Sequence, residues 1–281
     1  MVLNRVADTI FGAVPKTKTA SWQAYLSKHS GFKTAHVVEF LMADKDNPSS
    51  LLNALRAVRE NARMTRTALT RDAWEAINDT WLELKDALNE RAHKSDLPAL
   101  LSSVRQRAAY VRGTIDSTML RNDIYRFVTL GSMIERADNT ARILDTKYYV
   151  LLPSSASVGS SLDRVQWEMI LRSASAERSF HWLHGGEISP PAIVDFLVHD
   201  VRLPRSIAYC YDEIVSTLEA LESEYGRRAA CHDMAAAHEA HITASSSDLI
   251  IGTGLHEFLL DFIARNAQLS ACIEADYRFS K

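Results

Sequence analysis

Residues 130–152 read LGSMIERADNTARILDTKYYVLL, and this stretch decides the fold class. Apolar or small residues recur in it at steps of three and four, which places them on one face of an α-helix. The series starts just before the stretch and consists of Phe127, Leu130, Ile134, Ala137, Ala141, Leu144 and Tyr148. The stretch therefore predicts a long amphipathic helix that ends near Leu152.

The same spacing runs through most of the chain, over residues 51–67, 71–91, 97–112, 165–183, 204–221 and 254–277. Helix-start signals accompany several of these stripes: Ser50, Thr70, and Ser189 followed by two prolines. The Ser/Gly-rich segment at 154–163 is typical of a linker. No stretch shows the strict period-two alternation of a strand. The sequence predicts an all-α helical bundle.

The composition argues against several classes of protein, among them nucleic-acid binders and disulfide-rich proteins. The 281 residues are 47% hydrophobic and 24% charged, which are globular values. A formal net charge of −3 argues against a nucleic-acid partner. The three cysteines are neither a disulfide framework nor a zinc ligand set. With no signal peptide and no run of 18 apolar residues, we expect no membrane association and a cytoplasmic location.

Two segments repeat each other at a constant offset of 156 positions. Each has a short apolar helix that ends at Asp, a tight loop that carries Pro, and a Ser that caps the next helix. The identical pairs are Phe40 and Phe196, Leu41 and Leu197, Asp44 and Asp200, Pro48 and Pro204, and Ser50 and Ser206. We expect one domain over residues 1–281, built from two diverged repeats at roughly 1–116 and 117–281.

Residues 130–152 resemble the signature of the bacterial alpha-E family, an all-α domain named for a Glu-Arg motif, here Glu135-Arg136. Segments 40–66, 116–127, 195–210 and 254–262 agree with that family in its order, so the resemblance covers nearly the whole chain. It implies partners, because family members occur beside or fused to an ATP-grasp ligase, and beside transglutaminase-like or proteasome-related peptidases. It implies no established activity for the domain itself.

The chain departs from the family pattern at its N-terminus. The family usually carries the Glu-Arg helix twice, and residues 3–11 resemble the start of the first copy, aligned with residues 120–128. No Glu-Arg helix follows them, since the chain runs into GAVPKTKTAS. We therefore expect the N-terminal copy of the motif to be missing, through natural loss or because the chain is a shortened version.

The charged side chains of the long helix are the first site candidates. Glu135, Asp138, Arg142 and Asp145 step by three, four and three, and so form one stripe, with Arg136 one position round. A carboxylate and a guanidinium fixed on a helix could bind a ligand carboxylate or phosphate. They could equally form structural ion pairs. The structural interpretation is preferred for Asp138 and Asp145, and both stay open for Glu135 and Arg136.

A second polar set lies earlier in the chain. Arg59, Arg63 and Arg66 share a helix face, beside Glu60. They could complement the acids of the Glu135 helix or bind an anionic ligand, but an exposed charge pattern is the preferred interpretation. Arg126 adds charge at the start of the long helix.

The histidines of the chain do not have the spacing of a known metal site, and no nucleotide-binding motif is present. The segment CHDMAAAHEAH at 231–241 lacks the i, i+4 spacing of a metalloprotease, so we expect surface histidines there and no metal site. His256 and Glu257, near Gly254, are candidates for a site or for helix capping. No Walker, G-x-G-x-x-G or G-x-S-x-G motif is present, so we expect no cofactor, and a partner protein should bind any ATP.

Three hypotheses for function remain. The first is a helical accessory or substrate-positioning component of an ATP-grasp-associated peptide or amide ligation system. The second is an enzyme of amide-bond formation or transfer that uses Glu135 as base or ligand and Arg136 to hold an anion. The third is a structural scaffold that forms homo-oligomers.

Overall fold

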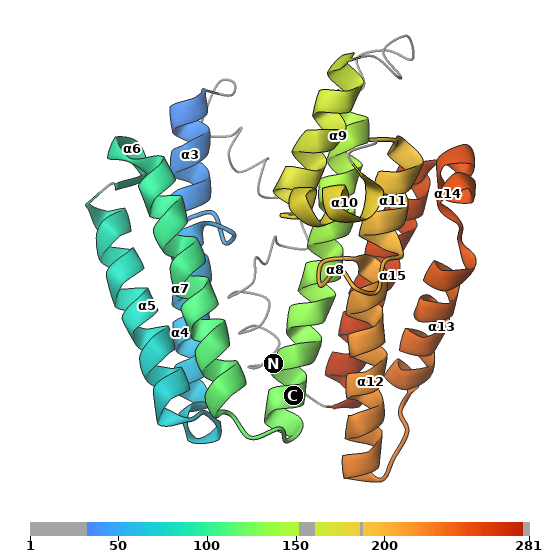
Figure 1. Cartoon of the computed structure of the whole chain (residues 1–281). Coiled ribbons are helices and arrows are strands. Elements are labelled where there is room, and N and C mark those ends of the chain that lie inside the picture. The colour runs from blue at the N-terminus through green and yellow to red at the C-terminus, as the bar shows by residue number, and fades with distance from the viewer. Residues whose placement is uncertain (1–32, 91, 152–160, 186–187, 278–281) are drawn as a thin grey trace. The chain divides into compact units, whose positions relative to one another are not determined.

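The computed structural model describes residues 33–90, 92–151, 161–185 and 188–277 (Figure 1). Within these ranges the chain consists of helices and connecting loops, with no β-strand. This confirms the predicted all-α class. The chain divides into two compact units, Met1–Ser132 and Met133–Lys281. The region where the first Glu-Arg helix was expected to be missing lies outside the described residues.

In the first unit, the helix α5 packs against α4 on one side and α7 on another. Buried aliphatic side chains such as Ile77, Leu84 and Ile115 fill the space between them, and each stabilises the unit by about 1.5–3 kcal/mol. The elements are α3 (Thr34–Met42), α4 (Leu51–Met64), the 3-10 turn η1 (Arg66–Ala68), α5 (Arg71–Asn89), α6 (Ala92–Ser95), α7 (Leu97–Thr118) and the beginning of α8 (Asp123–Leu151).

The second unit continues along α8, and in it α13 packs against both α12 and α15. Its largest fully buried side chains include Tyr211, Phe180 and Phe196. Tyr211 Oη donates to Asn266 Oδ1 at 3.0 Å, so this ring is buried with its hydroxyl bonded. The remaining elements are α9 (Ser161–Ser173), α10 (Glu177–His184), α11 (Pro190–Val198), α12 (Ile207–Tyr225), α13 (Ala230–Ala244), α14 (Ser247–Thr253) and α15 (Leu255–Asp276).

The helix-start signals are confirmed. The side chains of Ser50, Thr70, Ser189 and Ser206 each accept a hydrogen bond from the backbone N–H three residues on. Each bond satisfies one of the backbone donors that the first turn of a helix leaves without a partner. Removing such a cap typically costs about 1 kcal/mol.

Several predicted helix boundaries are wrong, two of them by the widest margin. Residues 165–183 do not form one helix, because the chain breaks between α9 and α10 at Ser175, which has a φ of 55°. Few non-glycine residues adopt this left-handed conformation, and no Gly or Pro marks the break in the sequence. Helix α7 also runs on to Thr118, beyond the predicted end at residue 112.

The two loops at the offset of 156 positions share two internal hydrogen bonds. In residues 44–50 and in residues 200–206, the Asp side chain accepts the N–H two residues on, at 2.8 Å and 2.9 Å. In both, the Ser N–H donates to the carbonyl three residues back, at 3.0 Å and 2.9 Å. We call them the first and the second loop; each connects a short apolar helix to a long capped one.

Candidate functional site

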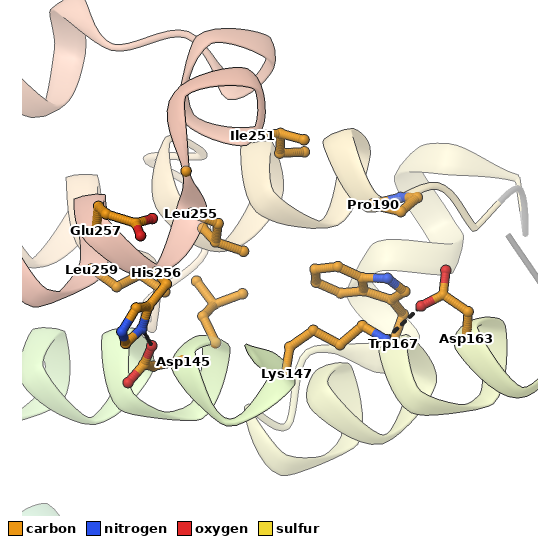
Figure 2. A pocket seen from close by; sticks show the side chains of 12 residues that line it. Asp145, Lys147, Asp163, Trp167, Pro190, Ile251, Leu255, His256, Glu257 and Leu259 are labelled. Carbon is orange, nitrogen blue, oxygen red and sulfur yellow. Dashed lines mark hydrogen bonds and ion pairs between the residues drawn. The ribbon is translucent and has the colours of Figure 1, made fainter. Parts of the chain in front are cut away.

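A cavity of about 370 Å³ lies in the second unit, where α8, α9, α11, α14 and α15 come together (Figure 2). This volume is in the range of small-molecule sites. Most of its lining is apolar, but five charged or titratable side chains also border it. The lining residues are Leu144, Asp145, Lys147, Asp163, Trp167, Pro190, Ile251, Gly254, Leu255, His256, Glu257 and Leu259.

One end of the cavity carries a buried ion pair. Lys147 Nζ donates to Asp163 Oδ1 at 2.5 Å and to Gln166 Oε1 at 2.6 Å. The side chains of Lys147 and Asp163 are only 5% and 8% exposed. The Lys147 ammonium also lies 5.4 Å from the ring centroid of Trp167. Because a buried charge needs a partner, these contacts hold the Lys147 ammonium in place beside the cavity.

The other polar element is a His–Asp pair that joins α15 to α8. His256 Nδ1 lies 2.6 Å from Asp145 Oδ1, and both side chains are nearly buried (Figure 2). A carboxylate bonded to Nδ1 fixes the orientation of an imidazole ring. The pair therefore places a polar group of defined geometry at the wall of an otherwise apolar cavity.

Gly254 allows Glu257 to fold back at the start of α15. Gly254 has a φ of 125°, and the Glu257 carboxylate occupies the space that a Cβ at position 254 would need. A larger residue at position 254 would therefore displace Glu257 as well as strain the backbone. Glu257 itself is exposed and lies in the first turn of α15, where a negative charge is favoured by the helix dipole.

The Glu-Arg pair of α8 lies in the same unit but does not line this cavity. Arg136 Nη1 donates to the Pro204 carbonyl at 2.9 Å, and Thr140 Oγ1 donates to the Arg205 carbonyl at 2.7 Å. Both bonds tie the second loop to α8. Burial and the neighbouring Arg136 guanidinium lower the pKa of Arg205. Arg136 therefore holds the backbone of the second loop against α8.

Glu135 is buried, and its Oε1 accepts from Asn139 Nδ2 at 3.2 Å. Asp138 and Arg142 form an ion pair along α8 with a 2.5 Å separation, and their side chains are 14% and 20% exposed. Asp145 pairs instead with His256 of α15. The four charged residues of the stripe are therefore largely buried and bonded within the second unit.

The second polar set lies in the first unit, where Arg59 and Arg63 both pair with Glu60 and Arg66 lies over the ring of Trp74. Arg59 Nε donates to Asn78 Oδ1 at 3.0 Å, and Arg63 Nη2 lies 2.8 Å from Glu60 Oε2. Arg126 lies in the first turns of α8 and is half-buried. None of these charged residues borders the cavity of the second unit.

The prediction of surface histidines in residues 231–241 is wrong for two of the three. His232 and His238 are 3% and 8% exposed, because the face of α13 that bears them packs between α12 and α15. His232 Nε2 lies 3.0 Å from the Leu218 carbonyl oxygen. Burial lowers the pKa of His238. No group of three or more His, Cys, Asp or Glu side chains among the described residues could hold a metal ion.

Sequence reasoning missed Lys147, Asp163 and Trp167 as site residues. A signal for Lys147 exists, because it lies three residues after Leu144 and so falls on the apolar face of α8. A lysine at such a position needs a buried partner. Nothing in the sequence identifies Asp163 as that partner. His256 and Glu257 were candidates, and the structure brings them to the cavity with Asp145.

Comparison with known proteins gives relatives and a family. The chain is 24% identical over 200 residues to uncharacterized proteins of Mycobacterium bovis and of two strains of Mycobacterium tuberculosis. The matches cover 66% of this chain and 21% of each relative, so the matched part spans about a fifth of their length. No solved structure matches the chain. None of the described helices has the length and apolar character needed to cross a membrane.

The family model that matches describes a predicted alpha-helical domain with a conserved ER motif. It covers residues 2–277, nearly the whole chain, and the Glu135-Arg136 pair lies within the covered region. This chain therefore belongs to the Alpha-E family.

Proposed function

We propose that this chain is a helical accessory of an ATP-grasp-associated peptide or amide ligation system, and that it binds and positions a substrate. The observation that carries the proposal is the cavity of the second unit. It combines an apolar lining with a few polar groups of fixed orientation, as small-molecule sites do. A module that positions a substrate needs such a site and needs no reactive group of its own.

Two further observations support an accessory role. The sequence has no Walker or G-x-G-x-x-G motif, so the nucleotide would be bound by a partner ligase. The matched relatives are several times longer than the matched region, which fits a helical module that works together with other domains. A transglutaminase-like or proteasome-related peptidase is the second class of partner that we propose.

The contacts of the Glu-Arg pair favour a structural role for it over catalysis. Arg136 uses its guanidinium to hold the second loop, and Glu135 is buried against Asn139. An enzyme that used this pair would need both groups to reach a substrate. Replacing Glu135 by Gln tests the enzyme hypothesis, since a catalytic Glu135 predicts loss of turnover in a variant that still folds.

We also propose that residues 1–116 and 117–281, roughly, are diverged copies of one ancestral unit. The shared hydrogen bonds of the two loops support this. The loops differ in how they are held. In the first, Asn53 Nδ2 donates to the carbonyls of Lys45 and Asn47, both at 2.8 Å, and Asn47 Nδ2 donates to the Phe40 carbonyl. A loop held by an asparagine within it and another in the first turn of α4 fits the proposed absence of a Glu-Arg helix from the first copy.

The test uses the purified chain together with an ATP-grasp ligase encoded next to it. We expect co-purification, and we expect the chain to raise amide formation by the ligase. Leu255→Trp should fill the cavity and abolish that stimulation while the complex still forms. Leu260→Trp is the matched control, because Leu260 is on the same helix, is 46% exposed and does not line the cavity.

Far-UV circular dichroism checks that each variant folds. If Leu255→Trp unfolds the chain, Ile251→Trp fills the cavity from α14, where Ile251 is partly exposed. The proposal is wrong if the ligase neither binds the chain nor responds to it. It is also wrong if filling the cavity leaves the stimulation unchanged.

A further inference from the structure

The charges that border the cavity do not balance. Three carboxylates line it, those of Asp145, Asp163 and Glu257, against a single ammonium, that of Lys147. The positive charge of Lys147 is already taken up by Asp163 at 2.5 Å. Because an ion pair in apolar surroundings is costly to break, Lys147 is poorly placed to recruit an anionic ligand.

Glu257 is the carboxylate best placed to meet a ligand. Its carboxylate points toward Leu255, a lining residue (Figure 2). Among the described side chains no cation pairs with it, whereas Asp145 is bonded to His256 and Asp163 to Lys147. The side chain is also exposed, so a charged group can reach it from solvent. The unmatched charge at the cavity is negative.

The apolar part of the lining determines the chemistry of the uncharged part of a ligand, which we call its body. Leu144, Leu255 and Leu259 offer aliphatic surface, and Trp167 offers an aromatic one. Burying apolar surface here stabilises a complex, because that surface is removed from water. A hydrocarbon or aromatic body therefore fits the cavity, and a volume of about 370 Å³ accommodates a small molecule of this kind.

We propose that the cavity binds a small primary amine with an apolar body, whose ammonium pairs with Glu257 and whose body lies against Trp167 and Leu255. This inference rests on the proposed function and extends it, because an amine is the acceptor in amide-bond formation. A carboxylate ligand fits less well, since it would face Asp145 and Glu257 and compete with Asp163 for Lys147.

Three probes with one body and different charge test the inference on the full chain alone. They are 3-phenylpropylamine, 3-phenylpropanol and 3-phenylpropionate, with affinities measured by isothermal titration calorimetry at pH 7.5. We expect the amine to bind about two- to fivefold more tightly than the alcohol, the gain of a partly exposed ion pair, and the acid to bind most weakly. A cavity-filling Leu255→Trp should weaken all three.

Glu257→Gln should remove the advantage of the amine and leave the affinity for the alcohol unchanged. Glu274→Gln is the matched control, because Glu274 is on the same helix and does not line the cavity. Binding of the acid more tightly than the amine would overturn the inference, and so would equal binding of all three or no binding at millimolar concentrations.

The amine titrations and the ligase experiment can give different results, so each tests its own proposal. These titrations need no ligase, so amine selectivity can stand even if no ligase responds to the chain. Conversely, stimulation of a ligase that depends on the cavity, together with no preference for the amine, would refute the inference and leave the proposed function in place.

Discussion

Replacing Lys147 by Met should destabilise the second unit strongly. Met keeps the aliphatic stem of the side chain and removes the ammonium, which leaves the Asp163 carboxylate, 8% exposed, without the cation that it pairs with. Breaking a buried ion pair in this way costs about 3–5 kcal/mol. Gln166 Oε1 loses its bond as well, at about 1 kcal/mol. We expect a total of about 4–6 kcal/mol, close to the whole stability of a small domain.

The double variant Lys147→Met/Asp163→Leu distinguishes the cost of an unpaired buried charge from the cost of lost packing. With both charges gone no buried charge is left unpaired, and the lost bond to the Gln166 oxygen remains, so the loss should shrink to about 1 kcal/mol. Asp163→Leu alone strands the Lys147 ammonium and should cost about 3–5 kcal/mol. The double variant should therefore be more stable than either single variant, an outcome that simple loss of packing cannot produce.

Urea unfolding of the full chain, followed by far-UV circular dichroism, measures the free energies of unfolding. Because the chain has two units and need not unfold in one step, hydrogen exchange should locate the loss to peptides of α8 and α9. Lys85→Met is the control: Lys85 pairs with Asp86 at the surface, and its loss should cost less than about 1 kcal/mol. The reasoning fails if the two site variants are additive in the double variant, or if Lys147→Met costs no more than the control.

Four more outcomes follow from individual contacts. Thr140→Val should cost about 1–2 kcal/mol in urea unfolding, because it leaves the Arg205 carbonyl without its donor. Asn53→Ala should cost a similar amount and speed hydrogen exchange within residues 44–50. Because burial holds the pKa of His238 below its ordinary value, stability should be full above about pH 6.5 and decline as the pH falls further, and His238→Leu should reduce that decline. Burial raises the pKa of Cys210 to about 12, so iodoacetamide at pH 8 should label this thiol only after unfolding.

Much of the fold could be predicted because its signals are local. A capping Ser directly precedes its helix and bonds the N–H three residues on, and the apolar face of α8 repeats every three or four residues. The break at Ser175 could not be predicted, since a positive φ at a serine has no signature in composition. The buried face of α13 was missed because tertiary packing, rather than residue type, buries His232 and His238.

The candidate site was harder to predict than the fold. His256 and Asp145 are 111 positions apart and meet only when α15 packs against α8. Lys147 and Asp163 are 16 positions apart, in α8 and α9, and no spacing rule connects them. A charged residue on an apolar face shows that some partner exists, but a single sequence does not say which residue it is.

The two loops impose different demands on the order of folding. Every side-chain bond from Asn47 and Asn53 that holds the first loop spans six to nine positions, so this loop can close as soon as its own residues are made. The second loop depends on Arg136 and Thr140, which are 68 and 65 positions away. Its anchors are long-range contacts, which form late and at a large entropic cost. The second loop would then reach its native conformation only after the Glu-Arg helix has formed. Replacing Arg136 would therefore slow or prevent the folding of this unit.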